Sequence, residues 1–222
     1  MIPLLHDFTD TTVLVVGGGR VGARKARRFA REARVVVVSP AFADEGEDAP
    51  AVDFGGAEKV RAALEPDDVG DWLDRLDPVL VVAATDDGEL NAAVERAAKA
   101  RTVLVNRTDT HGGRDPGSVV VPATVRDDPV VVAISTGGAS PALSKHLRET
   151  LEEDIEGSGA MAELTGLVRE ELQAREIQPE RRRTVVRDVV RSPDVWTALR
   201  TGNPNLRQIA REVVADRALD EA

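Results

Sequence analysis

Short apolar runs alternate with helical patterns along the first half of the chain. The runs are rich in valine and alanine, and glycine, proline or acidic residues bound them, which is typical of strands buried on both faces of a parallel sheet. The predicted strands are 12–16, 34–39, 78–84 and 102–106, and the predicted helices are 23–33, 57–64, 69–76 and 90–100. This alternation predicts an α/β fold with a Rossmann-like, doubly wound parallel sheet.

The pattern changes after about residue 112. Residues 118–125 and 130–135 are predicted strands, and the short acidic link between them is too short for a crossover, so we expect an antiparallel hairpin. Only helices follow, at about 141–155, 158–175, 180–191, 193–200 and 204–217. We therefore predict a Rossmann domain over 1–112, a dimerisation segment of hairpin plus helix over 113–150, and a helical domain over 151–222.

A glycine-rich loop joins the first predicted strand to the first predicted helix. Gly17, Gly19 and Gly22 have the spacing that allows a tight turn, close approach of a pyrophosphate, and packing of helix on strand. Arg20 and Val21 open the helix, and Arg20 either reaches a phosphate or is solvated. The context predicts a dinucleotide site, with a purely structural turn as the alternative.

The end of the second strand lacks the acidic residue that commonly binds the ribose of NAD. Ser39 and Pro40 stand there, followed by Ala41 and Phe42, so a hydroxyl or backbone group of this stretch must make the ribose contact. The position therefore does not decide between NAD and NADP.

Polar residues also end the next two strands, at the sheet edge where open α/β folds bind ligands. Thr85 and Asp86 are predicted to contact the cofactor, whereas Asp87 either caps the next helix or contacts a ligand. Asp109 follows the last parallel strand. It is a candidate general base beside the nicotinamide, with a turn-forming aspartate as the alternative.

A second strand–glycine turn–helix start lies outside the nucleotide fold. The strand 130–135 ends in Thr136, Gly137 and Gly138, and Ser140 stands at a helix N-cap with Pro141 at the first helical position. Such a turn aims backbone N–H groups and a positive helix end at an anion.

Composition narrows the class of protein. The formal net charge is −10, from 39 acidic against 29 basic residues, and only four of the basic residues are lysines. We interpret this surface as ordinary solvated charge or as adaptation to a salt-rich cytosol, and neither favours nucleic acid as a partner. The chain has no cysteine, its three histidines show no metal-ligand spacing, and no apolar run would span a bilayer. The N-terminus lacks signal-peptide features, so we expect a cytoplasmic protein.

Taken together, these motifs resemble those of the precorrin-2 dehydrogenase family, which includes the N-terminal module of sirohaem synthases. The resemblance covers most of the chain but is weak beyond about residue 150. It is carried by 16–25 (VGGGRVGARK), 83–87 (AATDD) with Asn91, Asn106 with Asp109, and 135–141 (STGGASP). The glycine loop is common to many dehydrogenases, whereas the later three motifs in this order are specific.

The resemblance implies oxidation of precorrin-2 to sirohydrochlorin with NAD⁺, in a homodimer that exchanges the hairpin region. It implies that Asp109 is the essential aspartate. Some members also insert Fe²⁺ into the product, and a carboxylate serves either step, so chelation stays open. The substrate is a polycarboxylate, and its predicted contacts are Arg107, His111, Ser135, Thr136, Gly137, Gly138 and Ser140. The alternative is a non-catalytic NAD-binding redox sensor or gating module. The fate of sirohydrochlorin and the role of the C-terminal helices are not predicted.

Overall fold

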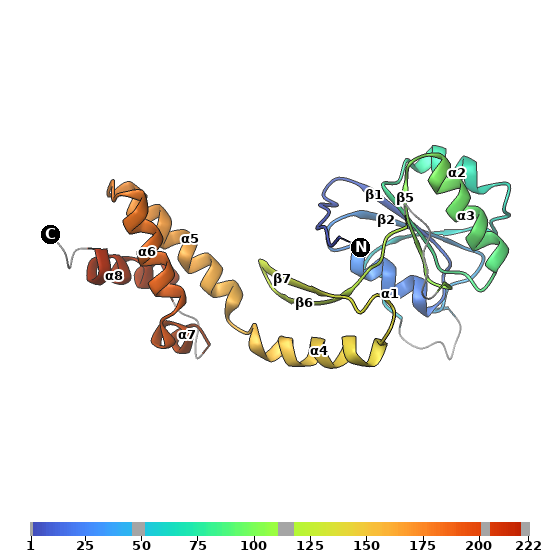
Figure 1. Ribbon diagram of the computed structural model, residues 1–222. Coiled ribbons are helices and arrows are strands. Elements are labelled where there is room, and N and C mark those ends of the chain that lie inside the picture. Colours follow the sequence, from blue (N-terminus) through green and yellow to red (C-terminus); the bar gives the residue numbers. More distant parts are fainter. Residues whose placement is uncertain (1, 46–51, 111–117, 201–204, 219–222) are drawn as a thin grey trace. The chain divides into compact units, whose positions relative to one another are not determined.

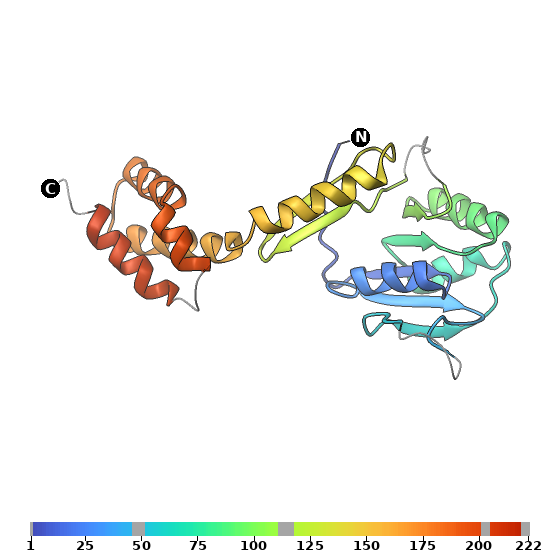
Figure 2. The ribbon, with the colours of Figure 1, turned by 90° about the horizontal axis from the view of Figure 1, so that it is seen from below.

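The chain forms two compact units, residues 1–121 and 122–222 (Figures 1 and 2). The computed structural model describes residues 2–45, 52–110, 118–200 and 205–218. Among these residues, no helix is both long and apolar enough to cross a membrane.

Unit 1 contains a five-stranded, all-parallel sheet in the order β3-β2-β1-β4-β5. Its elements are β1 (Thr12–Val16), α1 (Arg20–Phe29), β2 (Arg34–Ser39), β3 (Glu58–Arg61), α2 (Val69–Leu76), β4 (Leu80–Ala83), α3 (Gly88–Ala100) and β5 (Leu104–Arg107). The strand order reverses between β1 and β4, which is where open α/β sheets form a ligand crevice. The predicted Rossmann-like fold is confirmed.

The central strands are apolar throughout because helices cover both faces of the sheet (Figure 1). Along β1, Leu14 and Val16 pack in the core beneath α2 and α3, whereas Val13 and Val15 pack in the core beneath α1. This alternation of faces follows from the two-residue period of a strand. All four side chains are buried, which explains the unbroken apolar runs read from the sequence.

The helix predicted over 57–64 is wrong, because the segment contains the edge strand β3. Its residues pair in parallel with β2, from Val36 opposite Glu58 to Ser39 opposite Arg61. Most of its side chains are exposed, so the sequence shows no strand-like apolar alternation, and Glu, Lys and Arg favour helix by themselves. Pairing to a neighbouring strand overrides that local preference.

Unit 2 begins with the predicted antiparallel hairpin, formed by β6 (Ala123–Asp127) and β7 (Val130–Ile134). The hairpin is shorter than predicted. Ser118 lies outside it, within unit 1, and forms an isolated parallel bridge with Val105 of the same unit. The helix α4 (Pro141–Asp154) follows and packs along β6, while all of its own residues stay at least partly exposed.

The remaining helices form a separate core within unit 2. They are α5 (Ser158–Ala174), α6 (Pro179–Val190), α7 (Pro193–Arg200) and α8 (Leu206–Ala218). Leu164, Val168 and Leu172 of α5 are fully buried against the other three helices. The predicted boundary at residue 112 lies outside the described residues, and the boundary at 150 falls within α4. Both stay predictions.

Candidate functional site

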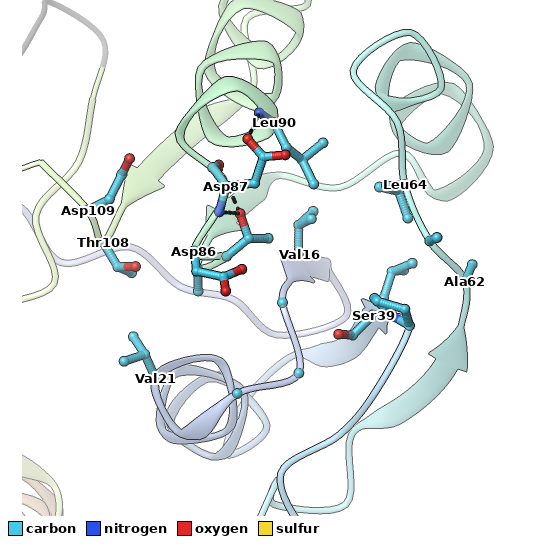
Figure 3. A pocket seen from close by; sticks show the side chains of 18 of the residues that line it. Val16, Val21, Ser39, Ala62, Leu64, Asp86, Asp87, Leu90, Thr108 and Asp109 are labelled. Carbon is cyan, nitrogen blue, oxygen red and sulfur yellow. Dashed lines mark hydrogen bonds between the residues drawn. The ribbon is translucent and has the colours of Figure 1, made fainter.

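A cavity of about 730 Å³ opens at the carboxyl ends of the parallel strands of unit 1 (Figure 3). It is lined by Val16, Gly17, Gly18, Gly19, Arg20, Val21, Val38, Ser39, Pro40, Ala62, Ala63, Leu64, Ala84, Thr85, Asp86, Asp87, Leu90, Thr108 and Asp109. Figure 3 shows Thr108 and Asp109 at one side of the cavity and Ser39 and Ala62 at the other. The glycine loop and the candidate base therefore border one space.

The glycine loop is built so tightly that a side chain fits at only one of its positions. A Cβ atom added at Gly17, whose φ is +117°, would lie 2.4 Å from the carbonyl oxygen of Ala84. One added at Gly22 would lie 1.9 Å from the carbonyl oxygen of Gly17. At Gly19, by contrast, nothing lies within 4 Å of the added Cβ, although this residue lines the cavity. Gly19 thus keeps open the space that a pyrophosphate needs to approach the backbone.

The start of α1 faces the same cavity and presents the positive end of the helix dipole. Gly19 is its N-cap and supplies no side-chain hydrogen bond, and the first turn holds no acidic residue. The first N–H groups are thus left without a capping side chain, as an anion site requires. Arg20 and Val21 line the cavity, and the side chain of Val21 is exposed.

The end of β2 supplies two kinds of contact. Ser39 and Pro40 line the cavity, and Ser39 is buried. Ala41 and Phe42 are not in the lining: their carbonyl oxygen and ring atoms lie against Gly18, where an added Cβ would be 2.3 Å from the oxygen of Ala41. Ala41 and Phe42, both predicted as cofactor contacts, therefore pack against the glycine loop at Gly18 and are not among the residues that line the cavity. Gly18 was not predicted as a site residue. The close approach of Ala41 and Phe42 leaves no room for a side chain at position 18, which explains why that residue is also a glycine.

After β4, the polar residues divide their roles. Asp87 caps α3, since its carboxylate accepts hydrogen bonds from the N–H groups of Glu89 (2.8 Å) and Leu90 (3.1 Å). Thr85 and Asp86 line the cavity. The fully buried Asn91 holds this turn, because its amide oxygen accepts a hydrogen bond from the Thr85 hydroxyl (2.8 Å) and its amide nitrogen donates to the Thr85 carbonyl (3.0 Å).

Asp109 is held by a chain of ion pairs. The guanidinium of Arg107 donates to both of its carboxylate oxygens, at 3.0 and 2.5 Å. Arg107 also donates to Glu95 of α3 at 3.1 Å, and Glu95 pairs with Lys99 at 2.8 Å. The side chains of Arg107 and Glu95 are 16 and 15% exposed, against 27% for Asp109. Arg107, predicted as a substrate contact, therefore lies under Asp109 and fixes its orientation.

This arrangement sets the charge of the Asp109 carboxyl. Hydrogen bonding from Arg107 holds its pKa below the usual value of 3.8, against the opposing effect of burial, and a hydrogen bond with Asn91 lowers it further. The same bond raises the pKa of Arg107. For Glu95, burial raises the pKa, but the bonds from Lys99 and Arg107 outweigh it and the net shift is downward. Asp109 is accordingly an ionised acceptor at neutral pH.

A buried polar contact stabilises β5, the strand that precedes Asp109. Asn106 is 2% exposed, accepts a hydrogen bond from the ammonium of Lys25 (3.0 Å) and donates to the carbonyl of Val119 (2.8 Å). Lys25 comes from α1, which begins at the glycine loop. This bond therefore ties the helix of the nucleotide loop to the strand of the candidate base. Three residues of this network were not predicted as site residues: Lys25, Asn91 and Glu95. In the sequence, Lys25 and Asn91 stand only as members of the family motifs, and Glu95 stands only on a helix that packs against β5.

The second glycine turn, in unit 2, has the predicted cap. Ser140 accepts a hydrogen bond from the N–H of Leu143 at 3.2 Å, and Pro141 opens α4. The hydroxyl of Thr136 donates to the Ser140 carbonyl (3.1 Å), and the hydroxyl of Ser135 accepts from the N–H of Gly137 (3.2 Å). Several hydroxyl and N–H groups of this turn are therefore hydrogen-bonded within the turn itself.

The other basic residues near the hairpin and the second turn are placed as follows. His111 and Arg114 lie outside the described residues. Arg126 pairs with Asp128 at 3.6 Å, and Arg148 pairs with Glu152 at 2.6 Å. Among the described residues, no group of three or more His, Cys, Asp or Glu side chains is arranged to hold a metal ion.

Comparison with known proteins places the chain in a family. Residues 4–123 match the family model described as "Putative NAD(P)-binding", and residues 127–153 match "Sirohaem biosynthesis protein central". The first match covers more than half of the chain and includes the whole sheet with its glycine loop.

Several similar proteins carry the name siroheme synthase. Those from Stutzerimonas stutzeri and Pseudomonas aeruginosa are 34 and 37% identical over 99% of this chain, which spans 46 and 43% of their lengths. Siroheme synthase 1 of Pectobacterium atrosepticum is 38% identical over 82% of this chain and 36% of its own. The chain thus spans less than half the length of these relatives. The structure named "SirC, precorrin-2 dehydrogenase" aligns with a TM-score of 0.69 at 23% identity, over 98% of this chain and 99% of its own, so the two folds agree.

Proposed function

The chain belongs to the NAD(P)-binding family that its residues 4–123 match, with a sirohaem-biosynthesis segment after it, and on this premise we propose that it oxidises precorrin-2 to sirohydrochlorin with NAD⁺. One observation carries the proposal. Asp109 lines the same cavity as the glycine loop, so a candidate base and a dinucleotide site share one space.

The residues of unit 1 fit a dinucleotide. The uncapped start of α1 and the open face of Gly19 suit the pyrophosphate, and Ser39 and Pro40 at one side of the cavity suit the adenosine ribose. Asp86 and Thr108 then border the nicotinamide end, next to Asp109 (Figure 3). When bound, NAD⁺ supplies the acceptor for the hydride that leaves the macrocycle. With a serine at the end of β2, contact to the ribose comes from a hydroxyl or from the backbone.

Asp109 takes the proton in this reaction. Oxidation of the macrocycle removes a hydride and a proton, and the products are sirohydrochlorin, NADH and H⁺. A carboxylate of lowered pKa is a weak base, but it is fully ionised at neutral pH and its two oxygens are held by Arg107. Arg107 and Glu95 are thus positioning residues: they hold the acceptor at the cavity edge before the substrate binds.

The polycarboxylate substrate needs cationic or N–H partners as well. We assign one of its carboxylates to the Ser135–Ser140 turn, whose glycines Gly137 and Gly138 have φ of +65° and +87°. A homodimer is part of the proposal, since α4 leaves Leu143 and Leu147 exposed by 47 and 37% and buries none of its residues. The cytoplasm remains the predicted compartment.

The test is direct. Purified protein is incubated with precorrin-2 and NAD⁺ under anaerobic conditions, and NADH absorbance and the sirohydrochlorin spectrum are followed together. We expect both to rise in equal amounts. If neither rises while the substrate is shown to be intact, the proposed reaction is wrong.

The remaining alternatives are separated in the same experiment. Iron insertion is tested by supplying sirohydrochlorin and Fe²⁺ without NAD⁺, and a sirohaem spectrum that forms no faster than in a protein-free control excludes it. A non-catalytic sensor would bind NAD⁺ yet show no turnover with precorrin-2. NAD⁺ binding is therefore measured by calorimetry alongside the assay.

A further inference from the structure

A groove of about 460 Å³ on the flank of α5 and α6 is surrounded by arginine side chains. We call it the arginine groove, and it is lined by Arg169, Pro179, Arg182, Arg183, Val186 and Arg187. All of these residues belong to the helical part of unit 2, so the groove is distinct from the cavity at the glycine loop. Its lining brings four cationic groups together around one hollow and includes no carboxylate among the described residues.

This composition is unusual for a chain of net charge −10. Elsewhere among the described residues, several arginines have a carboxylate partner, as in the pairs of Arg34 with Glu58 (2.7 Å) and Arg175 with Glu171 (2.8 Å). None of the four arginines of the groove forms an ion pair within the described part of the chain. The charges of the groove are thus left for something other than the protein's own acids to neutralise.

Two features of α6 destabilise the folded chain when no anion is bound. Arg183 and Arg187 are four residues apart, so they neighbour each other on one face of the helix and repel. The Nε atom of Arg182 is buried and has no hydrogen-bond partner. A buried donor without a partner is destabilising. A bound oxyanion offsets the repulsion, and it can satisfy Arg182 once the guanidinium turns toward it.

We propose that the arginine groove binds a small anion with several carboxylate or phosphate groups. Guanidinium groups bind both kinds of oxyanion through paired hydrogen bonds. The volume lies within the range of small-molecule sites, and Val186 and Pro179 provide an apolar surface for the body of the ligand. The inference concerns a second site and does not depend on the dehydrogenase reaction.

A smaller hollow, lined by residues of α5 and α8, serves as the control. It measures about 190 Å³ and is lined by Arg207 and Arg211 together with Glu170 and Glu171. The positive and negative charges are equal there. If arginine-rich surface alone attracted anions, the two places would bind equally, whereas our account expects binding only at the arginine groove.

The experiment uses calorimetry on the full chain at constant, low ionic strength, with triphosphate and citrate as separate probes and acetate as the monovalent control. We expect triphosphate, citrate or both to bind, and acetate to give no heat. In the variant Arg183→Gln/Arg187→Gln, binding should weaken about 100-fold, or about tenfold for each guanidinium removed. Both side chains are exposed and repel each other, so this variant should fold as the parent does, which circular dichroism checks.

The matched variant Arg207→Gln/Arg211→Gln should keep the parent affinity, and both variants should keep the parent affinity for NAD⁺. Triphosphate binding alone identifies a phosphate ligand, and citrate binding alone identifies a polycarboxylate; either supports the proposal. It is overturned if neither probe binds the parent, if binding survives Arg183→Gln/Arg187→Gln, or if both variants lose it equally. Binding of a single-stranded oligonucleotide without binding of either small anion overturns it as well.

Discussion

The chain contains two strand–glycine turn–helix starts that look equivalent in sequence but differ in structure. At the first, Gly19 caps α1 with no side chain and the loop borders a cavity of about 730 Å³. At the second, Ser140 caps α4, and the hydroxyl of Thr136 is bonded inside the turn. The first helix start thus leaves its N–H groups without a capping side chain, whereas at the second the Ser140 hydroxyl accepts the N–H of Leu143, so fewer N–H groups are free for a ligand. The following predictions test this difference, from the largest effect to the smallest.

Replacing Gly17 by alanine should damage the first turn severely. The new Cβ would lie 2.4 Å from a backbone oxygen at a φ of +117°, so both the collision and the conformation are unfavourable. We expect a loss of about 2–4 kcal/mol in the free energy of unfolding, measured by denaturant titration. Gly137→Ala is the control: its φ is +65° with nothing within 4 Å, and it should cost only about 1 kcal/mol. Equal losses in both variants would contradict the geometry.

Replacing Gly19 by alanine should separate cofactor binding from stability. Its φ of −73° suits alanine and the added Cβ meets no protein atom, so the free energy of unfolding should stay within about 0.5 kcal/mol of the parent. The methyl group enters the space assigned to the pyrophosphate, and the Kd for NAD⁺ should rise about tenfold or more. An unchanged Kd would show that the dinucleotide does not approach this residue.

Much of the fold could be predicted from the sequence. Runs of valine indicate buried strands, and the spacing of the glycines indicates a tight turn between strand and helix. The helix predicted over 57–64 failed for a physical reason: β3 is an edge strand whose side chains face solvent, and only its pairing with β2 makes it a strand. For the site, the sequence predicts single residues that follow strands, such as Asp109. The network of Glu95, Arg107 and Asn91 was not predicted, because contacts between α3 and β5 depend on tertiary packing.

Replacing Ser140 by alanine should weaken the second turn modestly. The variant removes the bond to the N–H of Leu143, and the loss of such a cap typically costs about 1 kcal/mol. Thermal and denaturant unfolding measure it, with Ser135→Ala as the control because its hydroxyl lies outside the helix start. If the assigned substrate carboxylate binds this turn, KM for precorrin-2 should change more than kcat in Ser140→Ala. A change in kcat alone would argue against that assignment.

Replacing Arg107 by glutamine should change turnover least near neutral pH, where Asp109 stays ionised in either protein. Without the guanidinium the pKa of Asp109 should rise, so the acid limb of the pH–rate profile should move to higher pH. The lowered pKa also means that the pair stabilises the folded state above pH 3.8 and loses this effect as the pH falls through the folded pKa. Carbon NMR of the Asp109 carboxyl tests the shift directly, and an unchanged midpoint would contradict this role of Arg107.

The most direct test of the central claim is turnover of precorrin-2 by the Asp109→Asn variant, measured together with its Kd for NAD⁺. Asparagine keeps the size of the side chain but takes up no proton. We predict that kcat falls at least about 100-fold while the Kd for NAD⁺ stays within about twofold of the parent, as expected for loss of a base outside the dinucleotide contacts. Unchanged turnover with NAD⁺ bound would contradict the assignment of Asp109 as the proton acceptor.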